Sequence, residues 1–292
     1  MFEGFESRRV QTGEVVLHCR TGGEGPPLLL VHGYPQSHVM WHKVAPALAE
    51  HFSVVAADMR GYGESEAPPA GPDGMAYAKR TMARDLSGLM EALGHPRFRV
   101  AGHDRGARVC YRLALDQPER VVQLAVLDVV PTLDTWEQLS TTAGLFAYHW
   151  YFLAQKAPFP ERLIGADPVY FLRHTLDSWC STEGAIGEEA FAEYAKAFDA
   201  DTIRASCEDY RAGATVDREF DAADREAGRR IECPMLALWG DPTGDRRGTL
   251  EVWRRWAVDV RGRGLPVGHF LPEEAPDEVI RELIDFFATG AS

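Results

Sequence analysis

Five short apolar runs, each ending at a glycine, histidine or aspartate, most constrain what this chain can fold into. The runs occupy residues 28–31, 53–57, 98–101, 121–127 and 235–239. Short, continuously apolar runs are typical of strands covered on both faces, as in a parallel sheet. Helical patterns lie between them at residues 41–50, 81–93, 107–116 and 250–256. This alternation predicts an α/β fold with a mostly parallel central sheet flanked by helices.

The stretch from residue 132 to residue 228 interrupts this alternation. It contains no convincing buried strand and is rich in aromatic residues at helical spacing, such as Trp136, Phe146 and Trp150. We interpret it as a helical cap inserted over the strand ends. The chain then divides into a first core segment (1–131), the cap (132–228) and a second core segment (229–292). A separate helical domain with no role in the site is the alternative.

The segment Gly102-His103-Asp104-Arg105-Gly106 follows a predicted strand and opens a predicted helix. It matches the G-x-S-x-G nucleophile elbow, with aspartate where serine is usual. The flanking glycines allow a tight turn that exposes the central side chain. The alternative is a glycine-rich turn whose aspartate caps the following helix.

Three further segments occur in the order and spacing found in the α/β-hydrolase superfamily, and the chain resembles that superfamily through them. They are His32-Gly33-Tyr34-Pro35, the string DMRGYGES from residue 58, and Gly268-His269-Phe270. The resemblance implies an α/β-hydrolase fold whose second core segment carries the catalytic histidine.

An aspartate nucleophile narrows the chemistry, because a carboxylate is ionised at pH 7 and needs no base in order to attack. It can displace a leaving group from an sp³ carbon and form an ester, which His269 hydrolyses by activating water. The backbone N–H groups of Arg105 and Tyr34 are candidates to hold the oxyanion. This chemistry indicates a dehalogenase or an epoxide hydrolase rather than an esterase.

A third residue is needed to orient His269. Asp128 follows the strand after the elbow, whereas Asp241 and Asp245 follow the later strand. The later position usually reads W-G-x-x-D, and here Thr243 stands at its end. We therefore favour Asp128 and keep Asp241 and Asp245 as alternatives.

Over essentially its whole length the chain resembles the fluoroacetate (haloacetate) dehalogenases, most specifically in the strings GHDRGARVCYRLALD, YHWYFLAQ and CEDYRAGA. The resemblance implies Asp104 as nucleophile, Asp128 as acid and His269 as base. It also implies that Arg105 and Arg108 bind the substrate carboxylate. His149, Trp150 and Tyr210 are implied to bind the halide. A homodimer is implied as well.

Each role that the resemblance implies has a physical explanation. Arg105 and Arg108 are three residues apart and share a helix face, and guanidinium groups bind carboxylates in bidentate geometry. Hydrogen-bond donors from His149, Trp150 and Tyr210 would stabilise departing fluoride in a water-poor site. The alternative for the two arginines is that they pair with acids of the cap or the surface. The alternative for the three aromatic residues is that they form the core of the cap.

The expected reaction converts a haloacetate to glycolate and halide through an ester on Asp104, with no metal or organic cofactor. Two rivals remain. An epoxide hydrolase would share the fold, Asp104 and His269, but commonly carries tryptophan where Arg105 stands. A non-catalytic ligand-binding relative often lacks a catalytic residue, whereas this chain retains Asp104, Asp128 and His269.

Composition sets the remaining expectations. With 31 Lys and Arg against 44 Asp and Glu, the net charge of −13 disfavours nucleic acid and anionic membranes as partners. No apolar run approaches the roughly 18–20 residues of a membrane span, and the first residues lack a signal-peptide core. Five scattered cysteines indicate reduced thiols. We therefore expect a cytoplasmic protein, and the resemblance to the dehalogenases implies that it acts on a small haloacid.

Overall fold

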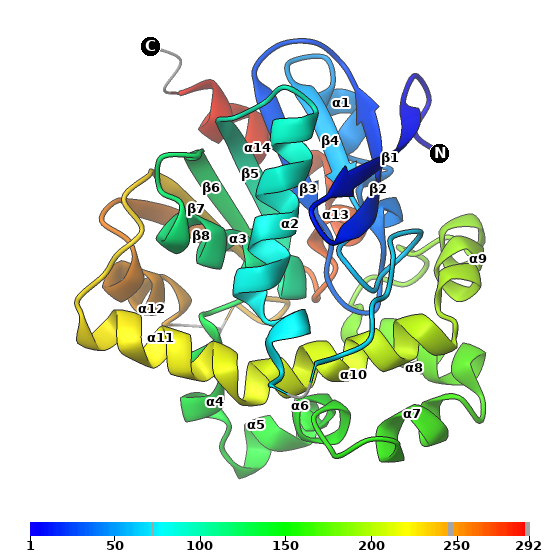
Figure 1. Cartoon of the computed structure of the whole chain (residues 1–292). Coiled ribbons are helices and arrows are strands. Elements are labelled where there is room, and N and C mark those ends of the chain that lie inside the picture. The colour runs from blue at the N-terminus through cyan, green and yellow to red at the C-terminus, as the bar shows by residue number, and fades with distance from the viewer. Residues whose placement is uncertain (72, 245–247, 290–292) are drawn as a thin grey trace.

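The computed structural model describes residues 1–71, 73–244 and 248–289. Its strands form one eight-stranded sheet in the order β1-β2-β4-β3-β5-β6-β7-β8 (Figure 1). Strands from β3 onward pair in parallel, whereas β1 and β2 are antiparallel to each other and β2 is antiparallel to β4. The mostly parallel sheet is thus confirmed. The strands are β1 (Glu6–Thr12), β2 (Val15–Gly22), β3 (Pro27–Val31), β4 (Ser53–Ala57), β5 (Phe98–His103), β6 (Val121–Leu127), β7 (Met235–Gly240) and β8 (Val260–Leu265).

Helices cover both faces of this sheet. Helices α2 and α3 pack together on the face toward the viewer in Figure 1, and α1 and α14 pack together behind it. The helices outside the segment 132–228 are η1 (His38–Trp41), α1 (Ala45–Leu48), η2 (Met75–Tyr77), α2 (Lys79–Ala92), α3 (Asp104–Asp116), α12 (Thr249–Trp256), α13 (Leu271–Glu274) and α14 (Pro276–Ala288).

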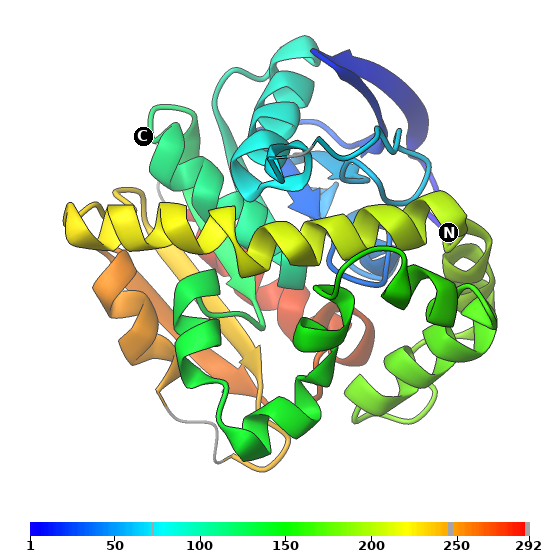
Figure 2. The same ribbon diagram turned by 60° about the horizontal axis from the view of Figure 1, so that its bottom comes forward.

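Every element between β6 and β7 is a helix in the part of the chain that the structure describes. We call residues 132–228 the helical insertion. It lies below the sheet in Figure 1, and α10 and α11 run end to end across the face that comes forward in Figure 2. Its helices are α4 (Thr132–Gln138), α5 (Thr141–Phe146), α6 (Tyr148–Leu153), α7 (Phe159–Ile164), α8 (Pro168–Trp179), α9 (Glu188–Ala197), α10 (Ala200–Ala214) and α11 (Val216–Glu226).

The five predicted strands are all present because their side chains are buried on both faces, and β5 and β7 are buried throughout. One predicted helix is wrong. Residues 41–50 hold the end of the 3-10 turn η1 and the short α1 instead of one helix. Pro46 lacks an N–H and restricts the residue before it, so an α-helix can contain it only in its first turn.

No helix among the described residues is long and apolar enough to cross a bilayer.

Candidate active site

The turn between β5 and α3 presents Asp104 at the carboxyl end of the sheet. Asp104 has a φ of +44°, a left-handed conformation that costs energy for a non-glycine residue. The two flanking glycines allow close packing around it. A Cβ on Gly106 would lie 2.1 Å from the carbonyl oxygen of His32, and one on Gly102 would lie 2.7 Å from the backbone nitrogen of Ala107. The predicted elbow can form because both positions are glycines, since a side chain at either would collide with the backbone.

His269 lies between two carboxylates. Its Nε2 is 3.9 Å from Oδ1 of Asp104, and its Nδ1 is 2.6 Å from Oδ2 of Asp128. The other oxygen of Asp128 accepts a 3.0 Å hydrogen bond from the backbone N–H of Gly240. Asp128 also has a positive φ, +54°. The arrangement matches a nucleophile, a base and an orienting acid in series.

This pairing supports Asp128 over the alternatives that the sequence left open. The Nδ1 of His269 is in hydrogen-bonding contact with Asp128, as expected of an orienting acid. Asp245 lies outside the described residues.

Both backbone polar groups of His269 are also engaged. Its N–H donates a 3.0 Å hydrogen bond to the carbonyl oxygen of Trp179, at the end of α8. Its carbonyl oxygen lies 2.7 Å from Nε2 of His103, the residue before the elbow aspartate. Burial lowers the pKa of His103 to about 4, so this imidazole is neutral at pH 7. The insertion and the elbow therefore both fix the position of the His269 loop.

Glu274 strengthens the same connection. Its carboxylate accepts hydrogen bonds of 2.9 Å from the backbone N–H groups of Gly268 and Phe270, on either side of His269. It also accepts from the backbone N–H of Ser181 at 2.8 Å, from the Ser181 hydroxyl at 3.0 Å and from the backbone N–H of Thr182 at 3.0 Å. Burial raises the pKa of Glu274, but these donors outweigh burial and the net pKa lies below the ordinary value. One charged carboxylate therefore ties the insertion to the His269 loop.

Asp104 is buried and ionised. Burial raises its pKa, but electrostatic interactions with His269, Arg108 and Arg105 outweigh this effect and lower the net pKa. Its Oδ2 atom has no hydrogen-bond donor within the described residues. An ionised oxygen without a donor suits a nucleophile, because hydrogen bonds would reduce its reactivity.

Arg105 is wholly buried and bound by an acid of the insertion. Its Nε and Nη2 donate to the Asp209 carboxylate at 3.1 and 2.6 Å, and Nη2 also donates to the Asp209 carbonyl oxygen at 2.7 Å. Asp209 also accepts from the Tyr62 hydroxyl at 2.8 Å and pairs with Lys79. Two nitrogens of Arg105, Nε and Nη2, therefore pair with an acid of the insertion, as the alternative reading of this arginine expected. The third, Nη1, is buried with no partner in the described chain.

The guanidinium of Arg108, one helical turn later, is likewise held by polar groups of the chain, here a carbonyl oxygen and two hydroxyls. Its Nη1 donates to the carbonyl oxygen of Val130 at 2.8 Å and lies 3.4 Å from the Thr132 hydroxyl. Its Nη2 lies 3.3 Å from the Thr135 hydroxyl. The buried Nε has no partner among the residues described. Each arginine therefore keeps one buried nitrogen without a partner among the described residues, and carboxylate binding by the two stays a prediction.

The three predicted halide ligands lie together in the insertion. The Tyr210 ring contacts the rings of His149 and Trp150 edge-to-face, with centroids 5.8 and 5.7 Å apart. The guanidinium of Arg105 lies over the Tyr210 ring at 4.1 Å, and that of Arg108 lies over the Trp150 ring at 4.6 Å. Burial lowers the pKa of His149 to about 3 and raises that of Tyr210 well above its ordinary value. Both groups are therefore neutral at pH 7.

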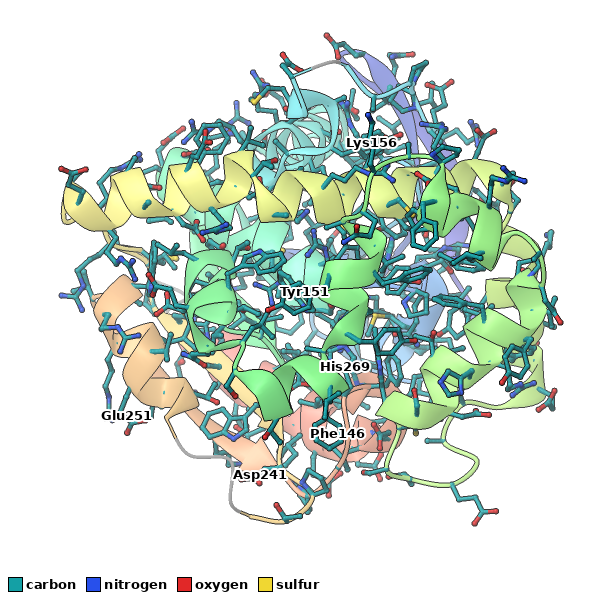
Figure 3. The ribbon with its side chains drawn as sticks, turned by 90° about the horizontal axis from the view of Figure 1, so that it is seen from below. Phe146, Tyr151, Lys156, Asp241, Glu251 and His269 are labelled. Atoms are coloured by element: carbon teal, nitrogen blue, oxygen red, sulfur yellow. The ribbon has the colours of Figure 1, made fainter. Side chains whose placement is uncertain are left out.

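A cavity of about 450 Å³ opens between the sheet and the insertion. The core lines it with Asp104, Arg108, Asp128 and His269, and the insertion lines it with Phe146, His149, Trp150 and Trp179. Figure 3 views the molecule from the insertion side, with His269 near the centre and Phe146 beside it. Three predicted site residues, Tyr34, Arg105 and Tyr210, are not among the lining residues. The ring of Tyr210 contacts those of His149 and Trp150, which do line the cavity, and both the Tyr34 ring and the Arg105 guanidinium contact Tyr210.

Tyr34 follows a glycine that touches the nucleophile. A Cβ on Gly33 would lie 2.5 Å from the Asp104 Cβ, so the loop passes against the elbow. Arg105 is the second residue of α3, where backbone N–H groups have no intrahelical acceptor. The ring of Tyr34 contacts that of Tyr210 edge-to-face at 5.4 Å. Both backbone positions suit the predicted oxyanion contacts.

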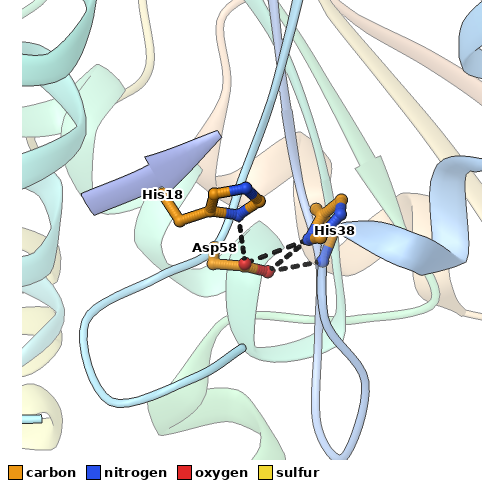
Figure 4. Close-up of side chains that lie close together, drawn as sticks. All are labelled: His18, His38 and Asp58. Atoms are coloured by element: carbon orange, nitrogen blue, oxygen red, sulfur yellow. Dashed lines mark hydrogen bonds and ion pairs between the residues drawn. The ribbon is translucent and has the colours of Figure 1, made fainter. Parts of the chain in front are cut away.

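Away from this cavity, His18, His38 and Asp58 form a cluster of side chains of the types that commonly bind metal ions (Figure 4). Their ligand atoms lie within 4.8 Å of one another. The Nδ1 atoms of His18 and His38 contact the Asp58 carboxylate at 2.8 and 3.0 Å, and the backbone N–H groups of His38 and Glu64 donate to it at 2.7 and 3.1 Å. Backbone donors aimed at these oxygens oppose a cation there. The cluster is therefore a hydrogen-bonded anchor for the loop after β4.

The sequence missed Asp209, Trp179 and Glu274. Asp209 directly precedes the predicted halide ligand Tyr210 in the sequence, so its pairing with a buried arginine could have been proposed. Trp179 contacts His269 through its own backbone carbonyl oxygen, and Glu274 binds mainly backbone N–H groups. No side-chain motif signals such contacts.

Comparisons with known proteins agree with this architecture. A family model described as alpha/beta hydrolase fold matches residues 26–275. Fluoroacetate dehalogenase from Burkholderia sp. is 45% identical, with 100% of this chain and 97% of that protein covered. Soluble epoxide hydrolase from Corynebacterium sp. is 36% identical, with 93% of each covered. A solved structure from Nostoc sp. PCC 7120, provisionally named an alpha/beta hydrolase, has a TM-score of 0.96 and 48% identity, covering 99% of this chain and 100% of that one. The chain belongs to the α/β-hydrolase family, in the group that includes fluoroacetate dehalogenase.

Proposed function

We propose that this protein hydrolyses haloacetates, preferentially fluoroacetate, to glycolate and halide. One observation carries the proposal. An ionised, buried Asp104 lies 3.9 Å from His269 and beside two arginines that each keep an unpartnered nitrogen. A small substrate that carries a carboxylate next to its reacting carbon fits this arrangement, because buried donors without partners favour an anion.

In the first step, Asp104 attacks the α-carbon from the side opposite the halogen. The electron pair of the carbon–halogen bond leaves with the halide, and a glycolyl ester forms on Asp104. Nη1 of Arg105 and Nε of Arg108 hold the substrate carboxylate. Donors from His149, Trp150 and Tyr210 receive the halide, which is worth most for fluoride because fluoride is a poor leaving group and a strong hydrogen-bond acceptor.

In the second step, His269 takes a proton from water, and the hydroxide attacks the carbonyl carbon of the ester on Asp104. Asp128 stabilises the imidazolium that forms. The backbone N–H groups of Arg105 and Tyr34 stabilise the oxyanion. Collapse of the tetrahedral intermediate releases glycolate and restores the Asp104 carboxylate. The mechanism routes no step through a metal or organic cofactor.

The epoxide hydrolase alternative shares the nucleophile and the base. We favour haloacetate because Arg105 follows the nucleophile and the insertion positions it through Asp209. A neutral epoxide would leave both buried arginine nitrogens unpaired, which costs binding energy. The higher identity to fluoroacetate dehalogenase points the same way.

A fluoride-selective electrode tests the proposal directly. Purified enzyme should release fluoride from fluoroacetate, and Asp104→Asn should not. Single turnover in ¹⁸O-labelled water should place the label in Asp104, because water attacks the enzyme's own carbonyl carbon. Turnover of styrene oxide without release of fluoride would sink the proposal, as would label found only in glycolate.

We also propose that the protein is a cytoplasmic homodimer joined through the insertion. Apart from Met1 and Val258, the exposed large apolar side chains among the described residues all lie between residues 145 and 170, including Leu145, Phe146 and Tyr170. Exposed apolar side chains on one segment of the insertion favour association through that segment. Light scattering should give twice the mass of one chain, and a monomer at micromolar concentration would contradict the dimer. Cell fractionation tests the location.

A further inference from the structure

Ser7 lies outside the proposed active site, at the edge of the sheet, and its hydroxyl contacts a histidine. It is exposed on β1, the strand that begins the sheet order. Its Oγ lies 3.0 Å from Nε2 of His18, in the neighbouring strand β2. The side chain of His18 is wholly buried. A hydroxyl that is open to solvent and bound to a fixed imidazole is the arrangement that activates a serine nucleophile.

The other ring nitrogen of His18 is held by a carboxylate. Its Nδ1 lies 2.8 Å from Oδ2 of Asp58, and Figure 4 shows the second nitrogen on the far side of the ring from Asp58. Burial raises the pKa of Asp58, but interactions with His38 and His18 outweigh it and hold the net pKa well below its ordinary value. An ionised carboxylate has no hydrogen to donate, so Nδ1 of His18 carries one. In the neutral ring, Nε2 therefore accepts from the Ser7 hydroxyl.

Backbone contacts keep the imidazole of His18 in this orientation. The backbone N–H of His18 receives the Ser65 hydroxyl oxygen as its acceptor at 2.9 Å, and the carbonyl oxygen of His18 accepts from the backbone N–H of Asp58 at 2.9 Å. The histidine and the carboxylate are thus fixed to each other through both backbone and side chain. The order of contacts, from hydroxyl to imidazole to carboxylate, is that of a nucleophile, a base and an orienting acid.

Two arginines lie on the same face of the β1–β2 pair as Ser7. Arg20 stands directly opposite Ser7 in the register, and Arg9 is two residues further along β1. Their side chains therefore project from the face that carries the Ser7 hydroxyl. The Nε atom of Arg20 is buried and has no hydrogen-bond partner in the part of the chain that the structure describes. Positive charge and an unpartnered donor on this face favour the oxyanion that forms when a serine attacks a carbonyl group.

We propose that Ser7, His18 and Asp58 form a second nucleophilic site, which takes acyl groups from activated esters and transfers them to water. The step uses neither Asp104 nor His269, so the inference does not depend on the proposed function. Because Ser7 is exposed at the edge of the sheet, an acyl donor reaches it from solvent. The quality of the leaving group then sets the rate, which is why the substrates are activated esters.

The reaction balances with one molecule of water. The Ser7 oxygen attacks the carbonyl carbon of the ester while its proton passes to Nε2 of His18. The carbon–oxygen bond to the alcohol breaks with its electron pair on oxygen, and His18 gives the proton to that oxygen. His18 then takes a proton from water, and the hydroxide attacks the carbonyl carbon of acyl-Ser7. The Ser7 oxygen leaves with the electron pair and regains its proton from His18, so ester plus water gives acid plus alcohol.

Wild-type protein with p-nitrophenyl acetate tests the site, with the acetylated residues mapped by peptide mass spectrometry. We expect a burst of about one p-nitrophenolate per chain, typical of an acyl-enzyme, and acetyl on Ser7. Ser178 is the internal control, because it is also exposed but its hydroxyl donates to the carbonyl oxygen of Thr175. Ser7 should be acetylated about 10²–10⁴-fold faster than Ser178, the contribution of a positioned base. Equal rates at the two serines would overturn the proposal.

Variants separate this site from the first one. Ser7→Ala should abolish the burst, whereas Ser178→Ala and Asp104→Asn should keep it. His18→Gln should slow acetylation of Ser7 by about 10²–10⁴-fold, with circular dichroism to confirm that this buried substitution leaves the fold intact. A burst that survives Ser7→Ala, or that disappears with Asp104→Asn, would overturn the proposal. Acetylation of Ser7 at the wild-type rate in folded His18→Gln would overturn it as well.

Discussion

The backbone N–H of His269 donates a 3.0 Å hydrogen bond to the carbonyl oxygen of Trp179. The proposed base is therefore held in place by the insertion as well as by its own loop. Glu274 reinforces this contact by binding backbone N–H groups on both segments.

Replacing Glu274 should slow ester hydrolysis more than ester formation, since His269 serves the second step. For Glu274→Gln we expect kcat to fall by about 10- to 100-fold, a range typical of a misplaced catalytic group. Rapid-quench kinetics should show a burst of one fluoride per active site followed by slow turnover. Glu226→Gln, on an exposed part of α11, is the control and should behave as wild type. An unchanged kcat with no burst would refute the positioning role of Glu274.

Asp209→Asn should weaken substrate binding. The change removes the charge that orients Arg105 and leaves Arg105 and Lys79 facing each other without it. We expect the KM for fluoroacetate to rise by about 10-fold, the value of one hydrogen bond to a charged group, with a smaller change in kcat. Asp217→Asn is the control, because Asp217 contacts Lys79 at 3.7 Å and takes no part in holding Arg105 in the contacts described. It should lower thermal stability and leave KM unchanged, and equal KM values for both variants would contradict this role for Asp209.

Trp150→Phe should discriminate between halides. Fluoride depends more on hydrogen-bond donors than chloride does, so we expect kcat to fall by about 10²–10³-fold on fluoroacetate and by about 10-fold on chloroacetate. Trp136→Phe is the matched control. Trp136 packs against Trp150 edge-to-face at 5.5 Å, but its N–H donates to the carbonyl oxygen of Gly213. A loss of equal size on both substrates would count against a halide-binding N–H on Trp150.

Glu273 should make stability depend on pH between about 4.5 and 7. Burial raises its pKa to about 7, although the Tyr194 hydroxyl donates to it at 2.6 Å. The folded state therefore favours the protonated form. This contribution, at most about 3 kcal/mol, is present in full below pH 4.5 and is lost as the pH rises through 7. Glu273→Gln should flatten that dependence in urea titrations at several pH values, and a slope equal to that of wild type would exclude Glu273 as its source.

The sequence predicted the central strands because their burial on both faces leaves a continuous apolar run. It missed β1, β2 and β8. β1 is largely exposed, β2 (Val15–Gly22) mixes apolar and polar residues, and β8 alternates exposed arginines with glycines. The bounds of the insertion stay a prediction, although its helical character is clear from the elements.

The candidate site was also predictable only in part. Asp104, Asp128 and His269 lie in motifs whose spacing reflects the geometry of strand ends, so they could be proposed from sequence. The pairing of Arg105 with Asp209 joins residues 104 apart in the chain, and no local pattern encodes it. The contacts of Glu274 were likewise not predictable, because all but the Ser181 hydroxyl are backbone N–H groups, which every residue except proline carries.

The left-handed backbone at Asp104 and Asp128 has an evolutionary consequence. Asparagine tolerates this conformation nearly as well as aspartate and has almost the same shape. A single conservative exchange at either position can therefore remove catalysis while leaving the chain well folded. A descendant that binds ligands without catalysis would thus differ from this enzyme by a single side-chain amide.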